Sequence, residues 1–271
     1  MKLKPYHIII YTIILFSSLK AESQQKDLSS VLVNLYDRIV FTVSDTERAR
    51  LNDSIALIIE SYASSDSVFS HRFSNLRFLG QISSSDSRIK MITWNVMLRE
   101  GTNIYNLYVI RKGKRSEGNK VYRLTGKHMP DPPESSRQYS ADDWYGALYY
   151  AIEPCKKDYV ILGLDFGGML VSRKIIDVLS FTDDGEIVFG KDLFLRGNEK
   201  RYREILEYST QSSVSLRFNT PKLIIFDHLS SFSTGEENEE LLGAGVSFDG
   251  FTCKKGNWIF IKGVDARNPK K

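Results

Sequence analysis

The sequence has very few residues of the kinds that hold metal ions. It contains 2 Cys and 4 His among 271 residues. The cysteines are far apart, and no two of these residues are spaced at i+2, i+3 or i+4, the intervals typical of structural zinc sites. The histidines are His7, His71, His128 and His228. We therefore expect no metal site and no cofactor.

A large excess of charge of one sign is also missing. The formal net charge is +4, and without residues 1–23, which hold three lysines and one glutamate, it is +2. A near-neutral chain gives no general electrostatic signal for nucleic acid or anionic membranes. The basic segment 111–127 is interpreted as a solvated loop, so we expect no nucleic-acid partner.

Long apolar runs are absent except for one near the N-terminus. Lys2 and Lys4 precede an apolar run over 7–19, and the small residues Ala21 and Ser23 follow it. This pattern is typical of a secretory signal peptide, here over 1–23, and the run is shorter than the roughly 20 residues that span a bilayer. An uncleaved anchor or a buried helix is the alternative. We expect export to the periplasm or the extracellular space, with no membrane span after cleavage.

Helical periodicity follows the leader. Two apolar stripes recur at helical spacing, and Ser44 with Glu47 forms a capping box before the second one. The stripes are Leu28, Val31, Leu32, Leu35 and Ile39, then Leu51, Ile55, Ile58, Ile59 and Tyr62. Residues 24–70 are therefore predicted to form an N-terminal helical segment.

The remaining residues, 71–271, have the pattern of an antiparallel β domain. Strand-like runs alternate with turn signals, without helical patterns between them. A loop rich in proline spans 126–143, and the run 203–209 could instead be a helix end. The runs are 88–98, 104–110, 146–153, 159–166, 173–181, 186–190, 203–209, 213–218, 222–228, 246–253 and 257–264. The expected fold is mainly β, a helical hairpin followed by an antiparallel β meander that forms a barrel, a sandwich or a small propeller.

Several segments of this sequence together resemble a known family. They are SSSDSRIKMITWNV (83–96), YGALYYAI (145–152), KIIDVLSF (174–181), EYSTQSSVSLRF (207–218), IIFDHLS (224–230), VSFDGF (246–251) and the Ala-Arg-Asn-Pro ending at 266–269. They resemble a family of uncharacterised exported proteins from Bacteroides-type bacteria. The resemblance implies export and a setting in the bacterial envelope, and it implies no catalytic residue.

Four aspartates in or beside the strand runs are candidates for catalysis, namely Asp165, Asp177, Asp227 and Asp249. Two carboxylates on facing strands could hydrolyse a glycoside. His228 could add acid–base chemistry, although it and Asp227 should point to opposite faces of a strand. Aspartate is also a common residue of turns and strand ends, where it binds local backbone N–H groups. Asp165-Phe166-Gly167 matches a kinase triplet, but the other kinase motifs are missing.

Aromatic residues and the two cysteines suggest two further sites. Trp144 and Tyr145 could stack on a sugar ring or contact a protein partner, or they could simply pack in the core. Cys155 and Cys253 could form a disulfide in an oxidising compartment, worth about 4–5 kcal/mol in the chain-entropy model. Cysteine is also a common buried hydrophobe, so both alternatives stay open.

These patterns favour a non-catalytic exported protein of the bacterial envelope with a binding or structural role, and a glycan or an envelope protein as partner. The alternative is a periplasmic or secreted hydrolase, directed at glycans, that uses paired aspartates.

Overall fold

The computed structural model describes residues 28–113, 118–127, 129–232 and 241–265. The expected signal peptide at 1–23 lies outside these residues. The chain divides into two compact units, one ending at Phe78 and one beginning at Leu79.

The first unit contains the two predicted helices. Residues 28–41 are helical, and α2 (Asp45–Ala63) is followed by the short 3-10 helix η1 (Asp66–Phe69). Ser44 caps α2, since its hydroxyl accepts the Glu47 N–H at 3.3 Å. The Glu47 carboxylate binds Arg50 at 2.7 Å. Leucines and isoleucines of both stripes are buried, namely Leu32, Ile39, Leu51, Ile55 and Ile59.

Aromatic contacts explain why the helical unit continues to Phe78. The Tyr36 and Phe78 rings stack with centroids 4.0 Å apart. The Tyr62 hydroxyl donates to the His71 carbonyl at 2.7 Å, and the Tyr62 ring packs on Phe73. The chain after η1 therefore folds back onto residues of both helices.

The second unit consists of three β sheets. The first sheet is antiparallel, in the order β1 (Gly80–Ser83), β2 (Ile89–Met97), β3 (Asn103–Arg111) and β4 (Lys120–Lys127). The middle sheet has the order β5 (Tyr139–Ser140), β9 (Ile187–Phe189), β8 (Val171–Phe181), β7 (Asp158–Asp165) and β6 (Leu148–Cys155), and β12 (Glu204–Ser209) also pairs with β8.

The third sheet has six strands. Their order is β11 (Glu199–Arg201), β10 (Phe194–Arg196), β16 (Asn257–Ile261), β15 (Leu241–Lys254), β14 (Leu223–Phe232) and β13 (Leu216–Thr220). Its strands pair antiparallel except β10 and β16, which are parallel.

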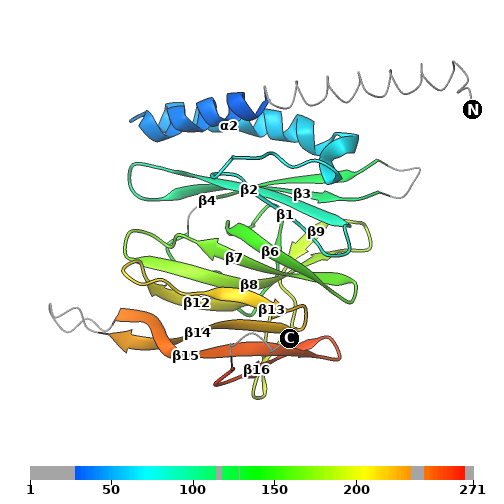
Figure 1. Ribbon diagram of the computed structural model, residues 1–271, viewed down its shortest axis with the longest axis vertical. Coiled ribbons are helices and arrows are strands. Elements are labelled where there is room, and N and C mark those ends of the chain that lie inside the picture. Colours follow the sequence, from blue (N-terminus) through cyan, green and yellow to red (C-terminus); the bar gives the residue numbers. More distant parts are fainter. Residues whose placement is uncertain (1–27, 114–117, 128, 233–240, 266–271) are drawn as a thin grey trace, which may run out of the picture. The chain divides into compact units, whose positions relative to one another are not determined.

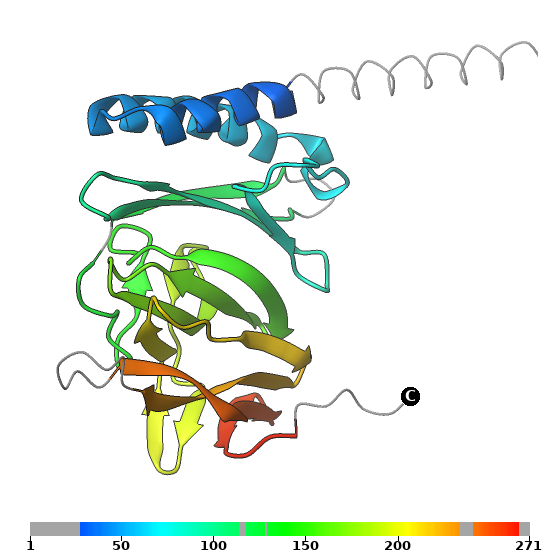
Figure 2. The same ribbon diagram turned by 60° about the vertical axis from the view of Figure 1, so that its left-hand side comes forward.

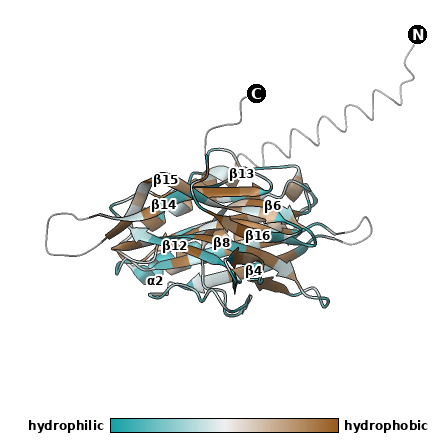
Figure 3. Cartoon of the chain, turned by 90° about the horizontal axis from the view of Figure 1, so that it is seen from below, coloured by the Kyte–Doolittle hydropathy of each residue, from teal (hydrophilic) through white to brown (hydrophobic). Residues whose placement is uncertain are grey.

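The three sheets form successive layers, visible in Figures 1 and 2. Residues of β7 and β8 alternate between two cores. Ile161 and Ile175 belong to the core shared with the first sheet, whereas Leu162 and Ile176 belong to the core shared with the third sheet. The middle sheet is thus buried on both faces, which explains the continuous apolar run in the centre of β7 (YVILGL). Figure 3 shows the same concentration of hydrophobic residues in the strands.

The mainly β prediction is therefore confirmed, and of the three architectures left open the sheets match a sandwich. No sheet of the described residues closes into a barrel. The run 203–209 forms β12, a strand and not a helix end. The proline-rich loop begins only after β4, because residues 126 and 127 of the expected loop 126–143 belong to that strand. It leads into the middle sheet through the short strand β5. Its side chains and carbonyls take part in the contacts described next.

Candidate functional site

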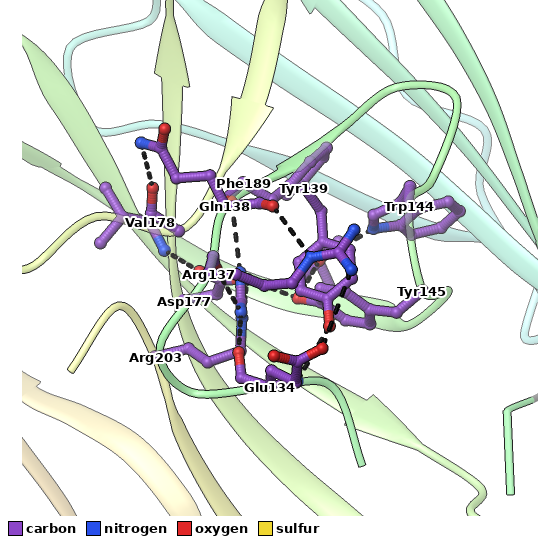
Figure 4. Close-up of polar contacts among 12 residues, drawn as sticks. Glu134, Arg137, Gln138, Tyr139, Trp144, Tyr145, Asp177, Val178, Phe189 and Arg203 are labelled. Carbon is purple, nitrogen blue, oxygen red and sulfur yellow. Dashed lines mark hydrogen bonds and ion pairs between the residues drawn. The ribbon is translucent and has the colours of Figure 1, made fainter. Parts of the chain in front are cut away.

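Asp177 of β8 lies in the core between the first and middle sheets, where it is paired with Arg203 (Figure 4). Arg203 Nε is 3.1 Å from Asp177 Oδ2, and both side chains are fully buried. The Tyr145 hydroxyl donates to the same oxygen at 2.5 Å, and the Val178 N–H donates to Oδ1 at 2.6 Å. The carboxylate is thus bound on both oxygens by groups of the protein itself.

Arg203 also binds the proline-rich loop. Its Nη1 donates to the carbonyl of Glu134 and to that of Arg137 at 2.8 Å. Its Nη2 donates to the Phe189 carbonyl at 3.2 Å, and the guanidinium lies over the Tyr139 ring at 4.6 Å. Five N–H donors in a planar fork suit arginine to such multiple contacts. Arg203 therefore joins the loop to the middle sheet.

Burial dominates the electrostatics of this cluster. Burial raises the pKa of Asp177, while Arg203 and the hydrogen bond from Tyr145 work in the opposite direction. Burial also raises the pKa of Tyr145 well above its usual value, and the Asp177 charge adds to the rise. A perturbed acid in a cleft would suggest catalysis, but buried ion pairs perturb pKa values in the same way.

Asp165 of β7 is held by a second buried arginine. Arg173 Nη1 is 3.0 Å from Asp165 Oδ2, with side chains 3% and 7% exposed. The Tyr105 hydroxyl donates to Asp165 Oδ1 at 2.8 Å. Arg173 also donates to the carbonyls of Met129, at 3.2 Å, and Pro130. This pair thus holds the start of the proline-rich loop as Arg203 holds its middle.

The two buried aspartates do not form a glycosidase pair. Asp165 of β7 pairs in register with Arg173 of β8, and Asp177 lies four residues after Arg173 in β8. Four residues of a strand span about 13 Å. Glycosidase carboxyl groups lie roughly 5 to 10 Å apart. Because each carboxylate is also turned toward its own arginine, the two do not face a common substrate position.

The candidate aromatic residues are buried. Trp144 and Tyr145 are 4% and 3% exposed and belong to the core between the first and middle sheets. The Trp144 indole N–H donates to the Tyr149 hydroxyl at 3.2 Å, which in turn lies 2.9 Å from the Tyr145 hydroxyl. The packing alternative therefore describes these residues, and neither presents a face on which a sugar could stack.

Asp227 lies in β14 and contacts Ser215, the residue just before β13. It accepts hydrogen bonds from the Ser215 backbone N–H at 2.7 Å and from the Ser215 hydroxyl at 2.9 Å. The carboxylate therefore supports the pairing of β13 with β14, which starts beside it at Leu216 and Phe226. As expected from strand geometry, Asp227 and His228 have different partners.

His228 and Asp249 form the remaining pair among the candidates. His228 Nδ1 is 2.8 Å from Asp249 Oδ2, and the histidine side chain is 45% exposed. The Gly263 N–H donates to Asp249 Oδ1 at 3.2 Å. The pairing of β14 with β15 contains a bulge here. Asp227 pairs with Phe248 and Leu229 pairs with Ala244, so residues 245–247 of β15 lie opposite the single residue His228 of β14. Such bulges redirect side chains and occur often beside active sites. The pair has the arrangement of a carboxylate that orients an imidazole.

Cys155 and Cys253 lie in the core between the middle and third sheets, and both are free thiols. Cys155 ends β6, and Cys253 lies near the end of β15. The structure thus brings together two residues that are 98 positions apart in the chain.

Sequence reasoning missed the two buried arginines. Arg173 and Arg203 are the first residues of the predicted runs 173–181 and 203–209, so both look like ordinary charged residues at strand ends. The only available signal was an aspartate inside an apolar strand, since a buried carboxylate needs a partner. Asp177 in KIIDVLSF is such a residue, but the sequence does not identify its partner.

In the part of the chain that the structure describes, no group of three or more His, Cys, Asp or Glu side chains could hold a metal ion. The described helices include none with the length and apolar character needed to cross a membrane. No protein-family model, curated protein or solved structure matches this chain.

Proposed function

We propose that this chain is a non-catalytic protein of the bacterial envelope, exported through its N-terminal leader, with a binding or structural role. The observation that supports it most is the buried pairing of Asp165 with Arg173 and of Asp177 with Arg203. The two carboxylates best placed inside the sheets are thereby neutralised by the protein itself. Their pairing stabilises the position of the proline-rich loop and leaves neither acid directed toward a substrate.

Export is supported by the sequence alone. The charged start, the apolar run over 7–19 and the small residues before Gln24 are the features of a signal peptide. The resemblance to exported proteins of Bacteroides-type bacteria agrees with them. N-terminal sequencing of the protein recovered from periplasm, membranes and medium tests this. A new N-terminus near residue 24 is expected, and intact Met1 in the cytosol would contradict it.

The non-catalytic role is tested by a screen of the full chain. Chromogenic glycosides, esters and peptides serve as substrates, and immobilised glycans and peptides as ligands. We expect no turnover above that of a sample without the protein. Turnover that rises in proportion to the protein concentration would contradict the proposal.

One observation favours the alternative of a hydrolase. The His228–Asp249 pair combines an exposed imidazole with a largely buried carboxylate that holds its Nδ1. Histidine in this arrangement can act as a general base. If the chain is a hydrolase, we expect this pair and not paired aspartates to act. His228→Gln should then abolish turnover with little change in stability, because the side chain is half exposed.

The same screen needs a surface control. Met169 and Leu170, in the loop between β7 and β8, are 77% and 73% exposed. Met169→Ser and Leu170→Ser change exposed apolar atoms and leave both buried arginine clusters intact. They therefore show whether any ligand found in the screen uses this loop.

A further inference from the structure

Two hairpin ends from different sheets meet where the cysteines lie. Cys155 is the last residue of β6, before the turn at Lys156, and Cys253 precedes the turn at Lys255 and Gly256. The Cys155 thiol is 3.9 Å from the Gly256 carbonyl. The Lys156 side chain packs closely on Gly256. A Cβ atom at position 256 would lie only 1.9 Å from the Lys156 Cε. The two turns are therefore in direct contact.

The thiols themselves are neighbours. Cys253 packs against the core cluster that contains Cys155. Burial raises the pKa of the Cys155 thiol. The neighbouring Cys253 thiol raises it further, and the Trp258 side chain opposes the rise. Cys253 is only partly buried, so a solution oxidant can reach it first.

We propose that Cys155 and Cys253 are a disulfide-forming pair that links the middle sheet to the third sheet under oxidising conditions. The oxidant is a small or protein disulfide. The partly exposed Cys253 thiolate attacks one sulfur of that disulfide, forms a mixed disulfide and releases the first thiol. The Cys155 thiolate then attacks the Cys253 sulfur, forms the internal bond and releases the second thiol.

The atoms balance in this exchange. Each protein thiol loses one proton, each released thiolate takes up one, and the oxidant disulfide is reduced to two thiols while the protein dithiol is oxidised. The raised pKa of Cys155 makes it the slower nucleophile, which suits the second, intramolecular step. The bridge needs no assumption about the proposed function, because it would form in any sufficiently oxidising solution.

The test uses the full folded chain equilibrated with glutathione disulfide, then unfolded in denaturant with iodoacetamide. Cys155→Ser and Cys253→Ser are the matched controls. In the oxidised wild type we expect no alkylated cysteine. Proteolysis of this sample should release a fragment in which the Cys155 and Cys253 peptides are joined. After reduction, both cysteines should be alkylated. Cys155→Ser should give a mixed disulfide with glutathione at Cys253, whereas Cys253→Ser should react more slowly.

A second measurement stays informative if a variant folds poorly. Oxidised wild-type protein should unfold at a higher temperature than the same protein kept in reductant. Two alkylated cysteines in the oxidised wild type, or bonds formed only between two chains on a non-reducing gel, would overturn the proposal.

Discussion

Arg203 and Asp177 form an ion pair in which neither side chain is exposed to solvent, with Nε and Oδ2 3.1 Å apart. Removing two charges from water costs several kcal/mol per ion, and only close pairing with further hydrogen bonds offsets it. The loop carbonyls of Glu134 and Arg137 and the Tyr145 hydroxyl supply those bonds. The loop carbonyls thus stabilise the buried ion pair, and Arg203 in turn fixes the position of the loop.

Removal of the Tyr105 hydroxyl should destabilise the second buried cluster. The hydroxyl donates to Asp165 and accepts the Phe166 N–H, both at 2.8 Å. Tyr105→Phe leaves both groups without this partner, so the free energy of unfolding should fall by about 1–3 kcal/mol. Urea unfolding of both proteins measures this change in the free energy of unfolding. The control Tyr150→Phe removes one hydrogen bond, to the Leu216 carbonyl, from a 38% exposed residue and should cost less.

A methyl group at Gly126 should be poorly tolerated. A Cβ at Gly126 in β4 would lie 2.4 Å from the Gly146 Cα and 2.7 Å from its backbone nitrogen. Since backbone atoms cannot rotate away, Gly126→Ala should lower the free energy of unfolding by about 1–3 kcal/mol or more. Gly118→Ala is the control, because nothing lies within 4 Å of its Cβ position. Equal unfolding temperatures for the two variants would contradict this close approach of backbones.

Acid should remove a stabilising contribution from Asp86. Burial works against its ionisation, but hydrogen bonds from the Ser84 hydroxyl, the Arg88 N–H and the Tyr159 hydroxyl hold its pKa below the usual value. A lowered pKa in the folded state means that the contribution is present above the unfolded pKa of about 3.9 and is lost as the pH falls through the folded value.

The measurement compares wild type with Asp86→Asn by thermal unfolding between pH 6 and pH 2.5. Wild type should be the more stable protein at pH 6, and the difference should shrink below about pH 4. Asp183→Asn, at an exposed turn, is the control. If the stability difference between wild type and Asp86→Asn grows as the pH falls, the pKa of Asp86 is not lowered in the folded protein.

The periodicity of the sequence predicted much of the fold. The stripes ending at Ile39 and Tyr62 predicted both helices, and the apolar runs around Ile92, Ile161 and Ile224 predicted strands. Short or charged strands were missed. The strand β4 (KVYRLTGK) alternates clearly in burial, but its lysines and arginine resemble a loop. The strands β5, β10 and β11 have only two or three residues each, too few for a periodic signal.

The candidate site was less predictable because it depends on contacts far apart in the chain. Asp177 and Arg203 are 26 residues apart, and the Tyr105 hydroxyl reaches Asp165 across 60 residues. A single sequence gives no information on such distances. It also cannot show whether Asp249 pairs with His228, since that contact follows from the shifted register of β14 and β15.

A double-mutant cycle of Asp177 and Arg203 tests most directly whether these residues are a structural pair. Asp177→Asn and Arg203→Met should each lower the free energy of unfolding by about 3–5 kcal/mol, since each leaves a buried partner uncompensated. The double variant should lose clearly less than their sum, with a coupling energy of about 1–3 kcal/mol. Single variants of normal stability, or effects that add within about 0.5 kcal/mol, would contradict the account.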